Sequence, residues 1–408
     1  MELTQVIAHN ISKLLEKNGL TQADLSSFLG ISRQTLSNYL KGTSTIDSVR
    51  LKKTADYFNV PITDLLDEPL VVKTPMLFRA APSVEKNIAT VEERVFNYIS
   101  RHESLLSQIG GSSHFTPEQL DLSIGINGKR VSVNYGLNRF PSSKYKLDDT
   151  LKAEIWSAAD VQRKLLGLNE SGAIELIPAL AKRGINIVFT KFHIQDLFGV
   201  SVCDSGHGCY IFINSDDNLT IERQLFTVAH EYAHLILHRP LFTSGNQAPV
   251  SSLYMELLDK MADCFAGRLL CPPSVVYSYA DTFSAADSTL RSIVFPAIRL
   301  KHKLNISFVS LLYALTSYGL ISRSVSSEYY SKFDSKFEPY PLKEVPALYE
   351  LFLERKTEVI SDELRRACAN GFQITEEDVA YYLDCDLNEA EVILKQLTEK
   401  DAQAAIFD

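Results

Sequence analysis

Apolar and polar positions alternate at helical spacing through most of the chain, beginning with the first 66 residues. There Ile7, Ile11, Leu14 and Leu15 share one face of a helix that the pattern predicts over about residues 5–17. Four more short helices follow it, and the pattern places them at about 22–29, 33–41, 48–58 and 62–66. A small bundle of five helices is therefore predicted.

Capping and turn residues separate the second and third of these helices. Thr21 and Ser32 occupy positions expected of helix N-caps, and Gly30 ends the second helix. A short helix, a tight turn and another short helix form the helix-turn-helix arrangement, in which the start of the last helix enters the major groove of DNA. Arginine there suits guanine, and glutamine or asparagine suits adenine. The residues predicted to contact a double-stranded DNA operator are Gln22, Ser32, Arg33, Gln34, Thr35, Asn38 and Lys41.

This segment resembles the XRE (Cro/C1-type) repressor domains through L-T-Q-A-D-L-S-S-F-L-G-I-S-R-Q-T-L-S-N-Y-L-K-G and the later F-N-V-P-I-T-D-L-L. The resemblance implies a DNA-binding domain over about residues 1–68. Over residues 1–66, seven Lys and Arg residues nearly balance six Asp and Glu residues, so weak non-specific affinity and binding as a homodimer are expected. The alternative is a protein-interaction module built on the same scaffold.

A connecting and spacing region is predicted over residues 69–150. Three prolines break any helix between residues 67 and 82, so an extended, loosely structured stretch is expected there. Within it, M-L-F-R-A at 76–80 is similar to a segment often seen after the repressor domain in fused regulators. One long helix is predicted over 84–109. Residues 112–150 are polar and rich in turn-forming residues, and no role is assigned to them.

Strand-like runs appear after two further helices, which are predicted at 155–166 and 174–182. The three runs are I-N-I-V-F at 185–189, F-G-V-S-V-C at 198–203 and C-Y-I-F-I-N at 209–214. Each is rich in β-branched or aromatic residues, and a Gly-His-Gly turn separates the last two. A small antiparallel sheet is therefore predicted.

An apolar, mostly buried helix follows the predicted sheet and contains the box H-E-Y-A-H. His230 and His234 lie four residues apart and point from the same face. Two such imidazoles can hold one Zn²⁺, with Glu231 beside the open coordination position as a general base. In the alternative the histidines only hydrogen-bond, but polar groups inside an apolar run need partners, and a metal supplies them. His238 lies about 12 Å along the axis from His230, which favours a packing or supporting role.

A catalytic zinc takes three protein ligands, so a second helix is expected to supply the third. That helix is predicted at M-E-L-L-D-K-M-A-D-C-F-A-G-R-L-L-C-P, residues 255–272. It carries Glu256, Asp259 and Asp263, and the spacing alone leaves open which of them is the ligand.

Residues 151–322 resemble the ImmA/IrrE metallopeptidases, proteins of mobile elements and stress responses that act on helix-turn-helix repressors. The matching motifs are G-I-N-I-V-F, F-I-N-S, E-R-Q-L-F-T-V-A-H-E-Y-A-H-L-I-L-H, A-D-C-F-A-G-R-L-L-C-P and Y-G-L-I-S. The resemblance implies a zincin-like fold in which His230 and His234 bind zinc and Glu231 activates water.

The third ligand in that family is a glutamate four residues before an Asp or Asn, and the aligned residue here is Asp259. The resemblance then implies that Asp263 orients one of the histidines. Because aspartate is one methylene shorter than glutamate, three alternatives stay open. The helices lie closer together, Glu256 is the ligand from one turn earlier, or the site is a degenerate remnant that does not hydrolyse peptides.

Helices are also predicted for most of the remaining chain. Residues 290–320 are predicted to be helical, and a polar and aromatic connector is expected over 324–341. Separate helices are predicted at 345–359 and 361–369. Residues 374–397 repeat the helix-turn-helix rhythm, but their exposed charge is nearly all acidic, which disfavours DNA binding. A regulatory or partner-binding bundle is therefore expected at the C-terminal end.

Composition narrows the class of protein. The 408 residues are 45% apolar and 22% charged, as in ordinary globular proteins, and the net charge of −9 requires any DNA contact to come from a local patch. No apolar run reaches the ~18 residues of a membrane span, and no secretion signal is present, so a cytoplasmic location is expected. The six cysteines form no C-x-x-C pair, which fits a reducing compartment, and Cys203 and Cys209 are predicted to be free thiols.

The predicted protein is mostly α-helical with a small α+β domain. Four parts are expected: a five-helix helix-turn-helix bundle (1–68), a linker and helical spacer (69–150), a zincin-like metallopeptidase domain with a small antiparallel sheet (151–322), and a helical C-terminal segment (323–408).

Three functions are consistent with these parts. The first is a DNA-binding regulator fused to a zinc endopeptidase that cleaves a repressor, or itself, in a stress, phage or mobile-element response. The second is a repressor whose peptidase fold is a non-hydrolytic sensor. The third is an antitoxin-like autoregulator that binds a toxin.

Overall fold

The chain forms two compact units, Met1–Lys73 and Thr74–Asp408. The computed structural model describes residues 3–17, 20–58, 60, 62–66, 77–78, 87–111, 116–126, 129–134, 146–204, 207–243, 252–284, 290–332 and 346–404. Among these residues no helix is both long and apolar enough to cross a membrane.

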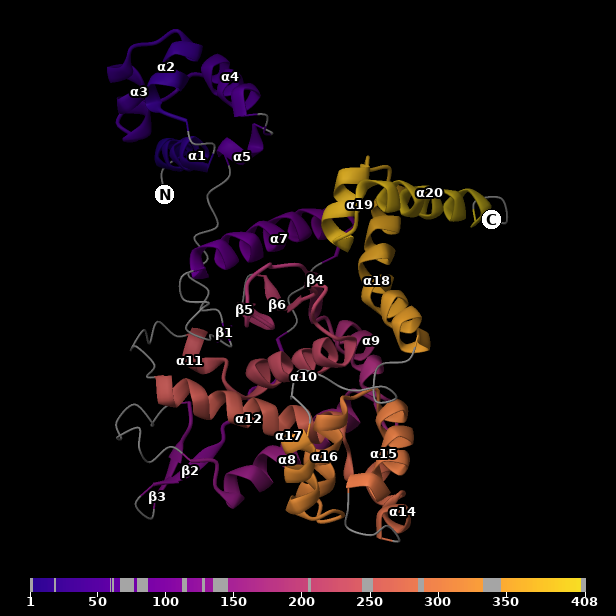
Figure 1. The fold of residues 1–408 in the computed structure, drawn as a ribbon. Coiled ribbons are helices and arrows are strands. Elements are labelled where there is room, and N and C mark those ends of the chain that lie inside the picture. Colours follow the sequence, from indigo (N-terminus) through magenta and orange to yellow (C-terminus); the bar gives the residue numbers. More distant parts are fainter. Residues whose placement is uncertain are drawn as a thin grey trace. The chain divides into compact units, whose positions relative to one another are not determined.

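The first unit is the predicted bundle of five helices, which is confirmed (Figure 1). Thr21 caps the second helix through a capping box with Asp24, and Gly30 ends it in the left-handed conformation (φ 66°). Leu25, Leu36 and Leu65 are fully buried in the core that the helices share. The helices are α1 (Leu3–Lys17), α2 (Gln22–Leu29), α3 (Arg33–Leu40), α4 (Ser48–Phe58) and α5 (Thr63–Leu66).

The second unit is built on a four-stranded sheet with the strand order β1-β5-β6-β4. The strands are β1 (Leu77–Phe78), β4 (Asn186–Thr190), β5 (Gly199–Asp204) and β6 (Gly208–Asn214). The prediction of a purely antiparallel sheet was wrong in one pairing, because β4 runs parallel to β6. The second strand of the β5–β6 hairpin lies beside β4. The sequence of such short strands does not show which strand each will pair with, or in which direction.

Two segments without predicted structure also contribute strands. In the stretch expected to be loosely structured, β1 pairs antiparallel with β5, with Leu77 opposite Ser201. In the stretch with no assigned role, β2 (Ser123–Ile126) and β3 (Lys129–Ser132) form an antiparallel hairpin. The following helix begins six residues earlier than predicted, at Asp149, because the Asp148 side chain caps it through the Leu151 amide.

Helices cover both faces of the four-stranded sheet (Figure 1). Alternate residues of β6 point to opposite faces: Ile211 and Ile213 pack with α10, whereas Tyr210 and Phe212 pack with α7 and the C-terminal helices. The helices of this unit are α7 (Ile88–Gln108), α8 (Asp149–Leu165), α9 (Leu176–Ala181), α10 (Ile221–Leu237), α11 (Pro240–Thr243), α12 (Ser252–Leu270), α13 (Pro273–Tyr277), α14 (Ala280–Ser284), α15 (Leu290–Leu304), α16 (Phe308–Ser317), α17 (Arg323–Lys332), α18 (Pro346–Ala369), α19 (Glu376–Leu383) and α20 (Leu387–Ala404), with a 3-10 turn at Ala173–Glu175.

The C-terminal helices differ from prediction in two places. Part of the predicted connector is the helix α17, because Tyr329 is fully buried against Phe308 and belongs to the core. The two helices predicted on either side of residue 360 are one continuous helix, α18. The rest of the predicted connector, 333–341, lies outside the described residues.

A buried polar network joins the C-terminal helices to the sheet. The His102 ring of α7 lies 2.9 Å from the Tyr210 hydroxyl of β6 and 2.7 Å from a Glu363 carboxylate oxygen of α18. All three side chains are almost fully buried. Such groups are costly to bury unless paired, so the network fixes how α7 and α18 lie on the sheet.

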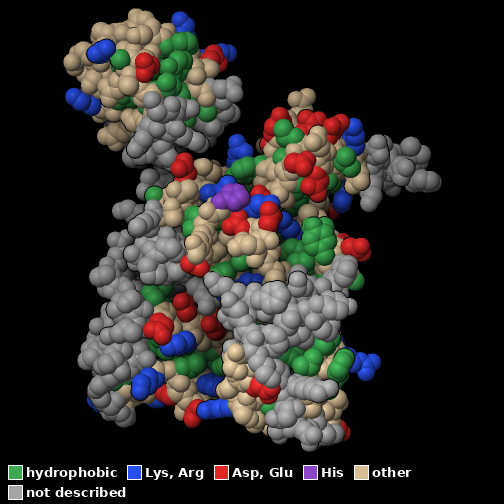
Figure 2. Space-filling model, in the orientation of Figure 1, with side chains coloured by type: hydrophobic (Ala, Val, Ile, Leu, Met, Phe, Trp, Pro, Cys, Tyr) green, Lys and Arg blue, Asp and Glu red, His purple; other side chains and the backbone are tan. Residues whose placement is uncertain are grey.

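Acidic side chains gather over α19 and α20, as Figure 2 shows. The exposed ones are Glu376, Glu377, Asp386, Glu389 and Glu391. This surface matches the predicted acidic character of the segment and repels the phosphate backbone of DNA.

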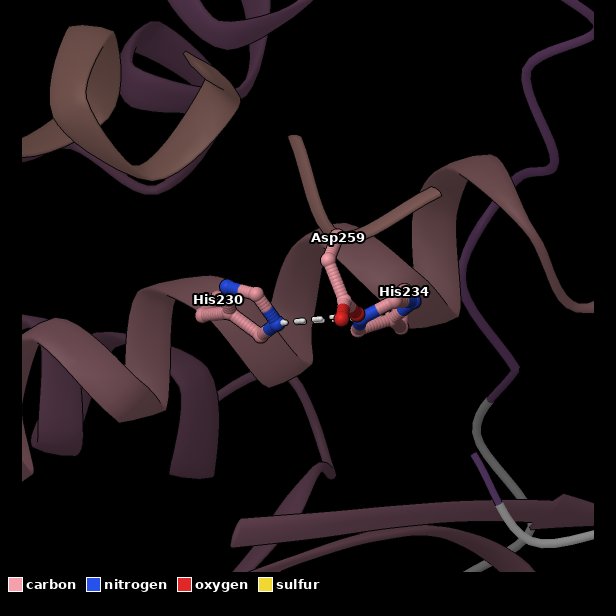
Figure 3. A group of neighbouring side chains, drawn as sticks. All are labelled: His230, His234 and Asp259. Atoms are coloured by element: carbon pink, nitrogen blue, oxygen red, sulfur yellow. Dashed lines mark hydrogen bonds and ion pairs between the residues drawn. The ribbon is translucent and has the colours of Figure 1, made fainter. Parts of the chain in front are cut away.

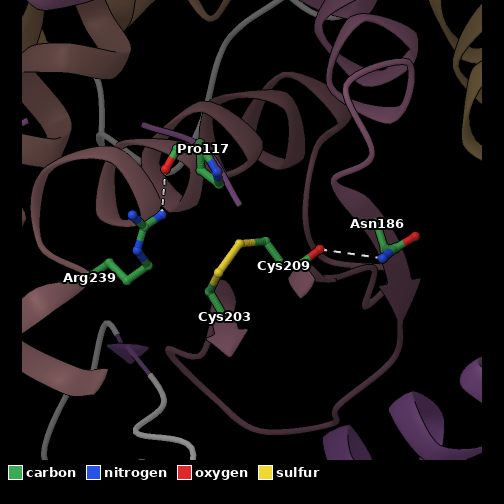
Figure 4. The surroundings of a disulfide bond; sticks show 5 residues. All are labelled: Pro117, Asn186, Cys203, Cys209 and Arg239. Carbon is green, nitrogen blue, oxygen red and sulfur yellow. Dashed lines mark hydrogen bonds between the residues drawn. A yellow bond between two sulfur atoms is a disulfide. The ribbon is translucent and has the colours of Figure 1, made fainter. Parts of the chain in front are cut away.

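Cys203 and Cys209 form a disulfide, so the prediction of two free thiols was wrong (Figure 4). The two residues face each other directly across the β5–β6 hairpin, and both are buried. The Asn186 side chain donates to the Cys209 carbonyl from the neighbouring strand β4 (3.4 Å). The spacing of the two cysteines in the sequence did not predict the disulfide, because the disulfide depends on the register of the β5–β6 hairpin.

Candidate metal centre and nucleic-acid interface

Helix α10 carries the H-E-x-x-H box through the centre of the second unit. Thr220 caps its first turn by accepting from the Arg223 amide (3.2 Å). Glu222 in that turn forms a buried ion pair with Lys301 of α15. All but two residues of the helix are buried, so the histidine rings inside it lie in an apolar environment.

His230, His234 and Asp259 bring three potential ligand atoms together (Figure 3). The two Nε2 atoms lie 3.1 Å apart. Asp259, which α12 contributes, places Oδ1 at 3.6 Å from Nε2 of His234 and 3.9 Å from Nε2 of His230. Both rings are only 1% exposed. Two side chains of α10 and one of α12 thus converge on a single point.

The geometry and chemistry of this group fit zinc. Two ligand atoms on a tetrahedral zinc with bonds of about 2.0–2.1 Å are about 3.4 Å apart, close to the separations of the three atoms here. Asp259 Oδ1 is buried and has no hydrogen-bond partner among the described residues, which a metal ion would provide. Two imidazoles and one carboxylate are also a donor set typical of catalytic zinc.

The structure separates the three acidic candidates on α12. Asp259 faces the histidines, whereas Glu256 is exposed and pairs with Lys260 (2.6 Å). Asp263 lies one turn further along, and its carboxylate accepts from Nδ1 of His230 at 2.8 Å. A carboxylate in that position fixes the ring orientation and leaves Nε2 free to bind a metal.

Glu231 lies next to this group and is fully buried. Burial raises the pKa of its carboxyl above the ordinary value, while His234, His230 and a hydrogen bond from Ser201 act in the opposite direction. The Ser201 hydroxyl donates to Oε2 (2.8 Å), and Oε1 has no partner among the described residues. A buried carboxylate with a raised pKa and one available oxygen is suited to accept a proton.

Two residues of β5 shape this site, and the sequence analysis missed both. Ser201 holds Glu231, although the two are 30 residues apart. At Gly199 an added Cβ would lie 2.7 Å from Thr227 Cγ2 and 3.0 Å from Glu231 Cγ, so only glycine lets β5 lie this close to α10. Neither residue belongs to a sequence motif. Their role follows only from the packing of β5 against α10 in the structure.

The candidate DNA-contacting residues lie on and beside α3 of the first unit. Leu36 and Tyr39 are buried in the bundle, so the opposite face of α3 is exposed. The Gln34 and Asn38 side chains share that face and are hydrogen-bonded to each other (3.2 Å). Arg33 at the helix start is exposed, as are Gln22 and Lys41 outside α3.

Ser32 and Thr35 have a local role at the start of α3. The Ser32 side chain caps the helix by accepting from the Thr35 amide (3.0 Å). The two hydroxyl groups are 2.8 Å apart and hydrogen-bonded. These hydroxyls therefore stabilise the helix, whichever contacts they also make to DNA.

Both sites fall within known families. The helix-turn-helix family model matches residues 11–65, and the model described as the IrrE N-terminal-like domain matches residues 180–316. This chain joins a helix-turn-helix domain to an IrrE N-terminal-like domain. The first matched segment contains α3, and the second contains the H-E-x-x-H box and Asp259.

One curated relative shares part of this joined chain. Over 96 residues it is 30% identical to the antitoxin PezA of Streptococcus pneumoniae serotype 4. The match covers 24% of this chain and 58% of that protein. The relative thus resembles only a part of the chain.

The position of Asp259 leads to a prediction about zinc affinity. We expect Asp259→Ala to lower the zinc affinity by more than 10–100-fold, which is roughly the loss caused by removing a residue that only supports a ligand. The loss is larger here because the substitution removes a ligand itself. Glu256→Ala is the matched control, one turn earlier on α12, and should bind zinc like the wild type. Competition with a chromophoric chelator measures both. The opposite order of effects would make Glu256 the third ligand.

Proposed function

We propose that this protein is a DNA-binding transcriptional regulator whose second unit is a zinc-dependent endopeptidase. One observation carries the proposal: ligand atoms of His230, His234 and Asp259 converge beside the buried carboxylate of Glu231. The proposed substrate is a repressor-type protein or the chain itself. A regulator of this kind works where the DNA is, so a cytoplasmic location is part of the proposal.

The residues around the site support a hydrolytic mechanism. Zinc bound by the three ligands would polarise a peptide carbonyl and acidify water. Ser201 holds Oε2 of Glu231, which leaves Oε1 as the oxygen that takes a proton from the attacking water. Because burial raises the pKa of Glu231, its carboxylate is a stronger base than an exposed one. Asp263 keeps His230 in the orientation for ligation.

Fusion to a helix-turn-helix domain favours regulation over general digestion. The exposed face of α3 presents Arg33, Gln34 and Asn38, whose side chains suit base edges in a double-stranded operator. The acidic protein as a whole gives little non-specific attraction to DNA. Binding as a homodimer to two half-sites is therefore part of the proposal.

A second candidate function is an antitoxin-like autorepressor whose peptidase domain binds a toxin without hydrolysis. The partial similarity to the antitoxin PezA favours it. It predicts a stable complex with a toxin and no dependence on Glu231. The two candidates differ in whether a peptide bond is cut.

Cleavage tests the first candidate. We expect Glu231→Gln to lower cleavage by roughly 10²–10⁴-fold, because it removes the base, while zinc binding is retained. The assay follows fragments of the protein itself and of helix-turn-helix repressors by mass spectrometry. Zinc-loaded wild type that cuts no protein and holds a toxin instead would favour the antitoxin-like candidate.

DNA binding leads to a separate prediction. After selection of a preferred duplex from random sequences, we expect Gln34→Ala to weaken binding to it by about 1–3 kcal/mol. The same variant should bind a scrambled duplex like the wild type, because the lost contact is to a base edge. Equal loss on both duplexes, measured by fluorescence anisotropy, would show that Gln34 does not read sequence.

A further inference from the structure

Three imidazoles form a hydrogen-bonded row along α10, and the proposed ligand set uses only two of them. His230 and His234 approach each other through their Nε2 atoms (3.1 Å). His234 turns its other nitrogen, Nδ1, to Nδ1 of His238 at 2.9 Å. His238 is fully buried at the C-terminal end of the helix, and its ring packs beside that of His234, with centroids 4.9 Å apart.

The positions of the protons in this row follow from its one fixed end. The Asp263 carboxylate can only accept, so Nδ1 of His230 carries a proton, and Nε2 is the nitrogen whose lone pair can face a metal. At each of the two remaining contacts, one nitrogen must donate and the other must accept. Without a metal, one arrangement of protons satisfies both contacts. A metal ion bound by the two Nε2 atoms would replace the contact between them and would require a second arrangement.

In the first arrangement, His238 donates from Nδ1 to His234, and His234 donates from Nε2 to His230. The Nε2 atom of His234 then has no lone pair for a metal. In the second, no proton lies between the two Nε2 atoms, and a metal ion would take its place. His234 then carries its proton on Nδ1 and donates it to His238, whose own proton is on Nε2. Only the second arrangement leaves lone pairs on both Nε2 atoms that face Asp259.

We propose that His238 is a positioning residue of the metal centre, because it accepts the Nδ1 proton of His234 and so holds that ring in the metal-binding tautomer. It does for His234 what Asp263 does for His230, with a neutral ring in place of a carboxylate. The inference rests on the proposed zinc site and adds the residue that prepares its second ligand.

The surroundings of His238 support this assignment. The ring's one described hydrogen bond joins its Nδ1 to Nδ1 of His234, so the described contacts orient His238 toward the second proposed ligand. A neutral acceptor also adds no further negative charge to a site that already holds the carboxylates of Glu231 and Asp259.

Two nearly isosteric substitutions isolate the accepting atom. Asparagine can place an amide oxygen near the position of Nδ1, whereas leucine has a similar shape and no acceptor. We expect His238→Leu to lower zinc affinity by roughly 10–100-fold and His238→Asn to recover most of that loss. Asn134→Leu is the control, because the Asn134 side chain donates to the Leu237 carbonyl at the same helix end without contacting His234 (2.9 Å). It should keep wild-type zinc affinity.

Side-chain ¹⁵N spectra of the zinc-loaded wild type give a second readout that needs no variant. We expect His234 to be protonated at Nδ1 and His238 at Nε2. A proton on Nδ1 of His238, or equal zinc affinity for the leucine and asparagine variants, would overturn the assignment. Wild type that binds no zinc at all would instead remove the proposed metal site itself.

Discussion

The close packing of α10 against α12 is the contact on which the proposed chemistry depends. An aspartate side chain is short, so Asp259 reaches the histidine rings only because the two helices lie near each other. Fully buried alanines on both helices, Ala233 and Ala262 among them, leave room for this approach. In this geometry Asp259, and not Glu256, is the carboxylate of α12 that lies beside the two histidines.

The sheet behind α10 holds this arrangement in place. Its face toward α10 carries Ser201, which contacts Glu231, and Gly199, which lets β5 lie against the helix. Its other face is covered by α7 and by α18–α20, segments far apart in the chain that the His102 network ties to β6. The C-terminal helices are therefore part of the compact second unit, and their acidic side chains form its outer surface there.

The sequence predicted what depends on local pattern. Helical spacing and caps were enough for the five-helix bundle and for α10, and the H-E-x-x-H box placed two imidazoles on one face. It could not predict the pairing of distant segments, such as β4 beside β6 or β1 on β5, or the hairpin register that sets Cys203 opposite Cys209. The contacts of Glu231 with Ser201 and Gly199 could not be predicted either, because they depend on how β5 packs against α10. The choice between Asp259 and Glu256 depended on which face of α12 points toward the histidines. The sequence does not show this, and the shorter side chain of aspartate does not decide it.

The two domains together describe a regulator with a peptidase fold, and the proposed activity depends on an ion held by His230, His234 and Asp259. X-ray absorption at the zinc edge of the purified protein tests this most directly. The account predicts one zinc per chain, bound by two imidazoles and by oxygen ligands at about 2.0–2.2 Å. Protein free of zinc, or zinc bound by sulfur without imidazole, would contradict it.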